Sequence, residues 1–99
     1  MKNSVRVVAR ITAKPGTGEH VKSVLRNLVE PTRQESGCIR YELLQNSQDS
    51  DELVLLEEWE DQAALDNHTA ASHTQAAEAE VEEFLQQLPP DVRIYQTIA

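Results

Sequence analysis

The sequence is poor in cysteine, in long apolar runs and in positive charge. Its one cysteine, Cys38, cannot form a disulfide within the chain, which favours a reducing compartment, so we expect the protein in the cytoplasm. No apolar run approaches the roughly 20 residues of a membrane-spanning helix, and the residues after Met1 show no apolar segment of a signal peptide. Nine basic residues against 17 acidic ones give a net charge of −8, which argues against nucleic acid or a membrane as a partner.

Motifs for common cofactors and metals are also missing. The sequence has no Gly-x-Gly-x-x-Gly, no His-x-x-x-His and no Cys-x-x-Cys. It has no internal repeat or long linker, and its 99 residues suffice for one domain, spanning 1–99. A chain of this size buries only about 60–70% of its unfolded surface. A second copy covering one face would therefore stabilise it.

The first third of the sequence predicts a strand and then a helix. Every second residue over 5–13 is apolar, which is the period of a strand with one apolar face. Thr17 is a plausible N-cap for the helix that follows. Pro31 should kink or end this helix, and Gly37 suits the position just beyond a last turn. The helix presents one apolar face, formed by Val21, Val24, Leu25, Leu28 and Val29.

The remaining two thirds predict a hairpin, helical segments and a last strand. Strand patterns over 38–45 and 53–60 flank a polar loop at 46–51. Asp61 is expected to cap a short helix, with a break near residues 71–72. The last strand covers 92–98. A second helical stripe before it is formed by Ala77, Val81, Phe84, Leu85 and Leu88.

The predicted order is β-α-β-β-α-β, the ferredoxin-like α+β arrangement. Right-handed crossovers place both helices on one face of a four-stranded antiparallel sheet. The other sheet face also carries many apolar residues and would form a large exposed patch on a single copy. We therefore expect a homodimer in which two such sheet faces meet.

Three segments together resemble one known family. They are GCIRYEL at 37–43, EEWEDQAALDNH at 57–68, and the Ser-His pair at 72–73. Their glycine-cysteine strand start, their Trp-to-His segment and the following histidine are similar to the antibiotic biosynthesis monooxygenases, especially the small members that act on quinols. The resemblance implies a dimeric α+β barrel with a pocket between sheet and helices. It also implies oxidation of a small aromatic or quinol-like substrate by O2 without a cofactor.

The chemistry implied by this resemblance requires a base more than a cofactor. A deprotonated phenol or hydroquinol can reduce O2 directly if the protein binds its rings, accepts its proton and excludes water. His68 is the candidate catalytic base, because imidazole exchanges protons near neutral pH. The alternative is a core histidine that only orders a loop.

Four further residues are candidate substrate-binding residues. Trp59 could stack on an aromatic substrate, although a plain core position is the alternative. Glu57 lies on a mostly apolar strand face, where a carboxylate must be paired, and an ion pair is the default expectation. Tyr41 could donate a hydrogen bond to a substrate oxygen, or simply be a core aromatic. His73 is expected to cap the last helix or to line the pocket mouth.

Two types of bound metal are not expected. His68 and His73 are five residues apart, which on a continuous helix is about 140° around the axis and a poor arrangement for one metal ion. The haem-degrading members of the family carry a Trp where this chain has His68 and a His where it has Ala77, so haem degradation is not expected.

The leading hypothesis is a cofactor-independent monooxygenase of the quinol type, with O2 as co-substrate. An isomerase or tautomerase of a small oxidised metabolite is one alternative, because the same base could move a proton without O2. A non-catalytic barrel that binds a ligand or serves in a stress response is another, since fold does not fix function. An open apolar pocket around His68 would favour an enzyme, and a space filled by side chains would favour the non-catalytic protein.

Overall fold

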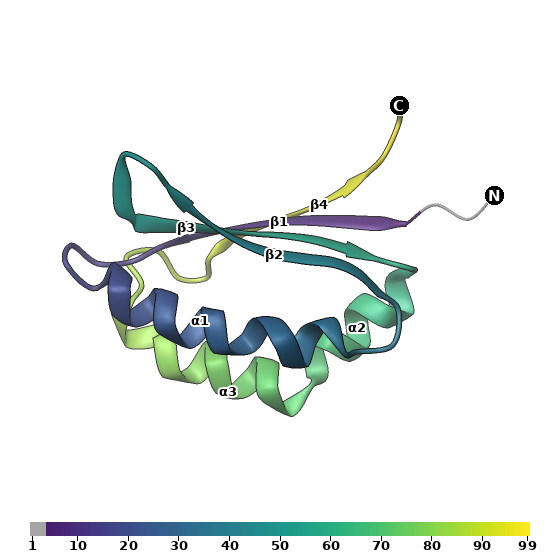
Figure 1. Ribbon diagram of the computed structural model, residues 1–99, viewed down its shortest axis with the longest axis horizontal. Helices are drawn as coiled ribbons and strands as arrows, with labels where there is room; N and C mark the ends of the chain where they lie inside the picture. The colour runs from purple at the N-terminus through teal and green to yellow at the C-terminus, as the bar shows by residue number, and fades with distance from the viewer. Residues whose placement is uncertain (1–3) are drawn as a thin grey trace.

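The computed structural model describes residues 4–99 and has two layers, a sheet and a helical layer (Figure 1). The four antiparallel strands lie in the order β2-β3-β1-β4, and all the helices cover one face, as the sequence predicted for a ferredoxin-like fold. The prediction that no signal peptide precedes the domain concerns residues 1–3, which lie outside the described part. The elements are β1 (Val5–Thr12), α1 (Gly18–Arg33), β2 (Cys38–Asn46), β3 (Asp49–Trp59), α2 (Gln62–Ala70), α3 (Ser72–Val81), the 3₁₀ helix η1 (Glu82–Phe84) and β4 (Asp91–Gln96).

The core lies between the sheet and the helices. Every second residue is buried from Val7 to Ile11 in β1 and from Leu53 to Trp59 in β3, because successive side chains of a strand point to opposite faces. None of the helices in residues 4–99 has the length and apolar character needed to cross a membrane. The most deeply buried large side chains of the core are Val21, Tyr41, Leu53 and Trp59.

The β2–β3 hairpin is tighter than the sequence indicated. The predicted loop at 46–51 is wrong in extent, because β3 begins at Asp49 and only two residues separate the strands. The side chain of Asn46 closes the turn: its Oδ1 accepts from the Gln48 backbone N–H at 2.8 Å, and its Nδ2 donates to Glu52 at 2.7 Å. The polar residues that were expected to form a loop are therefore mostly part of the paired strands β2 and β3.

The ends of α1 differ from the prediction. Thr17 is the N-cap residue, but its hydroxyl donates to the Lys14 carbonyl and caps no helical N–H. The carboxylate of Asp51, from β3, accepts from the Gly18 N–H at 2.9 Å and from the Gly16 N–H at 3.1 Å. Pro31 lies inside the helix and does not end it, because the helix continues to Arg33.

A break at Ala71 divides the helical segment after β3. Asp61 caps α2 as predicted, its Oδ1 accepting from the Ala64 N–H at 2.9 Å. Ala71 is extended, with φ −64° and ψ 143°, and separates α2 from α3 where the sequence predicted a break. The axis therefore changes direction between His68 and His73.

The sheet face opposite the helices is open in Figure 1, and the C-terminal residues rise on that side. Val8 pairs with Leu56, and Val54 pairs with Leu44, which form a contiguous apolar stripe on this face. Leu44 is 46% exposed. Ion pairs flank the stripe, between Arg10 and Glu52 at 2.6 Å and between Arg6 and Glu58 at 3.9 Å.

Candidate functional site

The ring of His68 lies in the core at the end of the helical layer. It projects from α2 toward the sheet and is 6% exposed. The Trp59 ring lies 4.7 Å from it between centroids, at 30° between planes, and the Tyr41 ring meets it edge-on at 5.6 Å. These two rings come from the adjacent strands β3 and β2. The structure thus brings together the candidate base and two of the candidate substrate-binding residues, whose roles remain predictions.

A residue that the sequence analysis did not single out, Glu35, joins both histidines. It lies in the turn between α1 and β2, and its Oε2 is 2.9 Å from His68 Nδ1 and 2.6 Å from His73 Nε2. No periodicity marks a carboxylate in a polar turn, so only its position two residues before Gly37 could have drawn attention to it.

The two histidines meet because the helix is broken between them. The argument that a five-residue spacing keeps them apart assumed a continuous helix and is wrong for this structure. With Ala71 extended, both rings reach one carboxylate oxygen. His73 therefore binds Glu35 rather than capping α3, whose N-cap is Ala71.

The hydrogen bonds to Glu35 fix where the ring protons lie. A carboxylate only accepts, so His68 Nδ1 and His73 Nε2 each carry a hydrogen when they bond to it. The neutral His68 ring then has a free lone pair on Nε2. The Thr74 hydroxyl oxygen, 3.3 Å from His68 Nδ1, adds a second contact to the same N–H. The arrangement leaves Nε2 as a proton acceptor.

Glu57 has a different partner from the one expected. Its Oε1 accepts from the Trp59 indole N–H at 2.9 Å, so the expected ion pair with an Arg or His is replaced by a neutral donor. Burial raises the pKa of the Glu57 carboxyl, whereas the hydrogen bond from Trp59 and, whenever its imidazole is protonated, the charge of His68 lower it. Glu57 thereby fixes the indole against which His68 packs.

The other two titratable groups near His68 keep their protons. Burial raises the pKa of the Tyr41 hydroxyl far above its ordinary value, with a further contribution from the charge of Glu57. Tyr41 is thus a hydrogen-bond donor and not a base. Burial also raises the pKa of the Cys38 thiol, which disfavours the nucleophilic thiolate.

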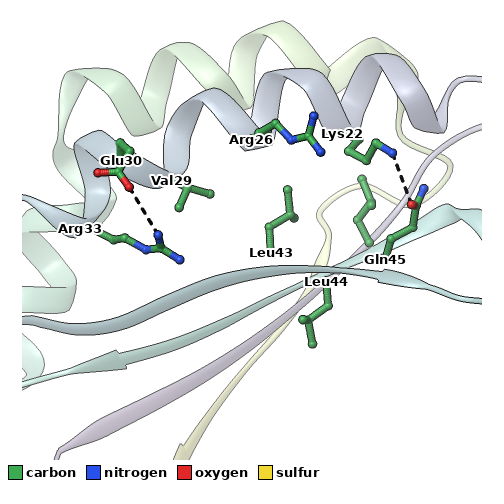
Figure 2. A pocket seen from close by; sticks show the side chains of 9 residues that line it. Lys22, Arg26, Val29, Glu30, Arg33, Leu43, Leu44 and Gln45 are labelled. Carbon is green, nitrogen blue, oxygen red and sulfur yellow. Dashed lines mark hydrogen bonds and ion pairs between the residues drawn. The ribbon is translucent and has the colours of Figure 1, made fainter.

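Two surface hollows lie apart from His68. The first, of about 450 Å³, runs between α1 and β2 and is drawn in Figure 2. Leu43 points into it from β2, while Arg26 and Lys22 overhang it from α1. The second, of about 350 Å³, follows the start of β2 and includes Tyr41 in its lining. Neither hollow is lined by His68, so these two hollows do not supply the expected open pocket around it.

One group of side chains in the described part of the chain is arranged to hold a metal ion. Glu35, His68 and His73 offer one carboxylate oxygen and two imidazole nitrogens within 4.8 Å of one another. Their burial decreases outward: the side chain of His68 is 7% exposed, that of Glu35 14% and that of His73 32%. The cluster therefore reaches solvent at His73.

Helices on one face of an antiparallel sheet, with a histidine cluster at one end of the core, define a small ferredoxin-like domain. Residues 4–89 match the family model for antibiotic biosynthesis monooxygenase, and the chain belongs to this family.

Relatives of known sequence support this membership. The chain is 36% identical over 85 residues to "Putative monooxygenase Rv0793" of Mycobacterium tuberculosis, covering 86% of this chain and 83% of the relative. It is 34% identical over 77 residues to "Putative monooxygenase YcnE" of Bacillus subtilis, covering 78% and 81%.

Solved structures agree with the sequence relatives. The Rv0793 structure has a TM-score of 0.89 and 31% identity, covering 97% of this chain and 96% of that one. PA3566 of Pseudomonas aeruginosa has a TM-score of 0.86 and 36% identity, covering 100% and 96%.

Proposed function

We propose that this protein is a monooxygenase that oxidises a quinol or polycyclic phenol with O2 as co-substrate and needs no cofactor. The observation that carries the proposal is the orientation of His68. Glu35 accepts from Nδ1–H, Trp59 packs on the ring, and Nε2 is left to accept a proton. Family membership and the names of the relatives support oxygenation as the reaction class.

The reaction balances with a phenol and O2 alone. His68 Nε2 takes the phenolic proton, and the phenolate passes one electron to O2. The phenoxyl and superoxide radicals combine to form a carbon–oxygen bond, and the resulting peroxide anion takes the proton back from His68 Nε2. Loss of water from the hydroperoxide then gives a quinone and leaves His68 neutral again. One oxygen atom enters the product, and the other leaves as water.

The surrounding side chains have separate roles in this proposal. Glu35 and Trp59 hold the ring of His68, and Tyr41 supplies an O–H donor for a developing anion. The substrate approaches from the side of His73, where the cluster is exposed. His73 then contacts the substrate at the mouth of the site, and Glu57 acts through its hydrogen bond to the Trp59 indole.

We also propose that the working unit is a homodimer built on the open sheet face. The apolar stripe of Val8, Leu44, Val54 and Leu56 lies at the middle of that face. The charged residues that flank it are already paired within the chain, as Arg6–Glu58 and Arg10–Glu52. Two copies can therefore meet there without burying an unpaired charge. Covering the stripe also removes the exposed patch of a small domain.

A second candidate function is ligand binding without catalysis. The deep burial of His68 favours it, because a base that meets its substrate needs space in front of it. The two candidates differ in whether O2 is consumed.

Oxygen uptake tests the proposal. The purified protein is mixed with reduced naphthoquinones, anthrones and other polycyclic phenols, and O2 is followed with an electrode. His68→Ala is compared with His20→Ala, which changes an exposed histidine on α1. We expect O2 uptake by wild type and His20→Ala, and a rate at least about 100-fold lower in His68→Ala, as for loss of a general base.

Full turnover by folded His68→Ala would exclude the role of His68 as the base. Binding without uptake by wild type would favour the non-catalytic protein, and turnover without O2 an isomerase.

A further inference from the structure

The Glu35–His68–His73 cluster has the spacing of a metal site as well as that of a hydrogen-bond network. Glu35 Oε2 lies 2.9 Å from His68 Nδ1 and 2.6 Å from His73 Nε2, and all three atoms lie within 4.8 Å of one another. Around an ion with bonds of about 2.1 Å, neighbouring ligand atoms are about 3.0–3.4 Å apart. A shift of a few tenths of an ångström that moves the Glu35 oxygen away from the two nitrogens would give separations suited to one ion.

The three ligands differ in freedom in a way that allows those shifts. His68 is held between the Trp59 and Tyr41 rings and offers a fixed Nδ1. Glu35 lies in a turn outside helix and strand, and the His73 side chain is 32% exposed in the first turn of α3. One fixed ligand and two adjustable ligands can adapt to an ion, and His73 gives it a route from solvent.

We propose that Glu35, His68 and His73 bind one divalent transition-metal ion per chain. Two imidazole nitrogens and one carboxylate oxygen suit Zn²⁺, Co²⁺, Ni²⁺ or Fe²⁺, whereas Mg²⁺ and Ca²⁺ prefer oxygen ligands throughout. Three protein ligands leave at least one position for water or another small ligand. On binding, the hydrogen that each ring now directs at Glu35 moves to the other nitrogen of the same ring, so both imidazoles bind the ion in their neutral form.

Metal binding has a consequence for His68. An ion on Nδ1 leaves the neutral ring with its hydrogen on Nε2, so the ring can no longer accept a proton there. The metal-bound and metal-free clusters are then two alternative states, and the ion inhibits proton abstraction. This consequence rests on the proposed function, whereas the binding site itself does not.

Metal titration tests the site directly. The protein is treated with a chelator, desalted, and titrated with Zn²⁺ by calorimetry and with Co²⁺ by visible absorption. Trp59, the one tryptophan of the chain, gives an independent fluorescence signal, because its ring lies 4.7 Å from that of His68. We expect saturation at one ion per chain, a Co²⁺ spectrum showing nitrogen ligation, and a change in Trp59 fluorescence.

Three variants separate the site from other histidines. Loss of groups that merely support a metal ligand weakens binding by 10–100-fold, so Glu35→Gln and His73→Asn should each weaken Zn²⁺ binding at least about tenfold. His20→Asn, on α1, should bind within about twofold of wild type. Both ligand positions are partly exposed, and circular dichroism verifies that these variants fold. Absence of saturable binding in wild type, or equal affinity in all the variants, would overturn the proposal.

Oxygen uptake distinguishes failure of the site from failure of the proposed function. Uptake by chelated protein that falls as Zn²⁺ saturates the site supports both proposals. Zn²⁺ binding without any uptake supports the site and overturns the oxygenase assignment. Uptake without metal binding overturns the site alone.

Discussion

The imidazole of His68 packs against the indole of Trp59 with 4.7 Å between ring centroids and 30° between planes. Both rings are almost fully buried, and the indole N–H donates to Glu57 at 2.9 Å. Glu57, Trp59 and His68 thus form a chain of contacts from β3 to α2. Substitutions of Glu57 or Trp59 should therefore affect both the stability of the protein and the orientation of the His68 ring.

Trp59→Phe should lower the free energy of unfolding by about 2 kcal/mol, because it leaves space in the core and a buried carboxyl without its donor. Urea unfolding followed by circular dichroism measures the change. Tyr95→Phe, at a position 49% exposed, is the control and should change the free energy by less than about 0.5 kcal/mol. A similarly small change for Trp59→Phe would contradict the packing of the indole against His68 and its hydrogen bond to Glu57.

Glu57→Gln should raise the free energy of unfolding relative to wild type, and this difference should grow as the pH rises from acid to neutral. Burial raises the pKa of Glu57 in the folded state, so the folded protein retains a proton that the unfolded chain releases near pH 4.5. Stability from this residue is therefore lost as pH rises above that value. Glutamine keeps an oxygen acceptor for the Trp59 N–H and does not ionise.

Urea unfolding of wild type and Glu57→Gln at a series of pH values measures this difference. The two proteins should be closest in stability at low pH and diverge toward neutrality. Glu78→Gln, on the exposed face of α3, controls for loss of one negative charge. A constant difference between wild type and Glu57→Gln at all pH values would mean that the carboxyl titrates normally.

The sequence predicted the fold well, because strand and helix periods were clear in most segments. The alternation in β1 and the apolar stripe of α1 specify which face of each is buried. Asp61 and the break before Ser72 were predicted from local capping chemistry, which depends on neighbouring residues. The hairpin was predicted too wide, since the side-chain bonds of Asn46 that close it have no periodic signal.

The candidate site was only partly predictable. Trp59, His68 and Tyr41 were identified because the family pattern contains them, and the strands that carry Tyr41 and Trp59, β2 and β3, proved adjacent. Glu35 was missed because its partners are 33 and 38 residues away and only the tertiary fold joins them. Such a contact depends on the angle at Ala71, which a helical wheel does not represent.

Asp51→Ala should destabilise the protein by about 1–2 kcal/mol, because its carboxylate caps the start of α1 from another strand. Asp51→Asn keeps one acceptor oxygen and should cost less. Glu78→Ala, at an exposed position of α3, is the control and should cost less than about 0.5 kcal/mol. Equal stability of all three variants in urea would show that Asp51 contributes nothing to this helix start.

Leu56→Lys should dissociate the proposed homodimer while leaving the fold of each chain intact. Leu56 lies beside Val8 on the open sheet face, and its side chain there contributes to no part of the helix-covered core. A lysine at the middle of an interface must bury an ammonium group without a partner, so the dissociation constant should rise at least about tenfold.

Ala79→Lys, on the exposed surface of α3, introduces the same charge and should leave the assembly unchanged. Light scattering over a range of concentrations measures the mass, with wild type and Ala79→Lys at twice the mass of one chain. A Leu56→Lys protein that stays dimeric, or a wild type that is monomeric, would place the apolar stripe outside any interface between copies.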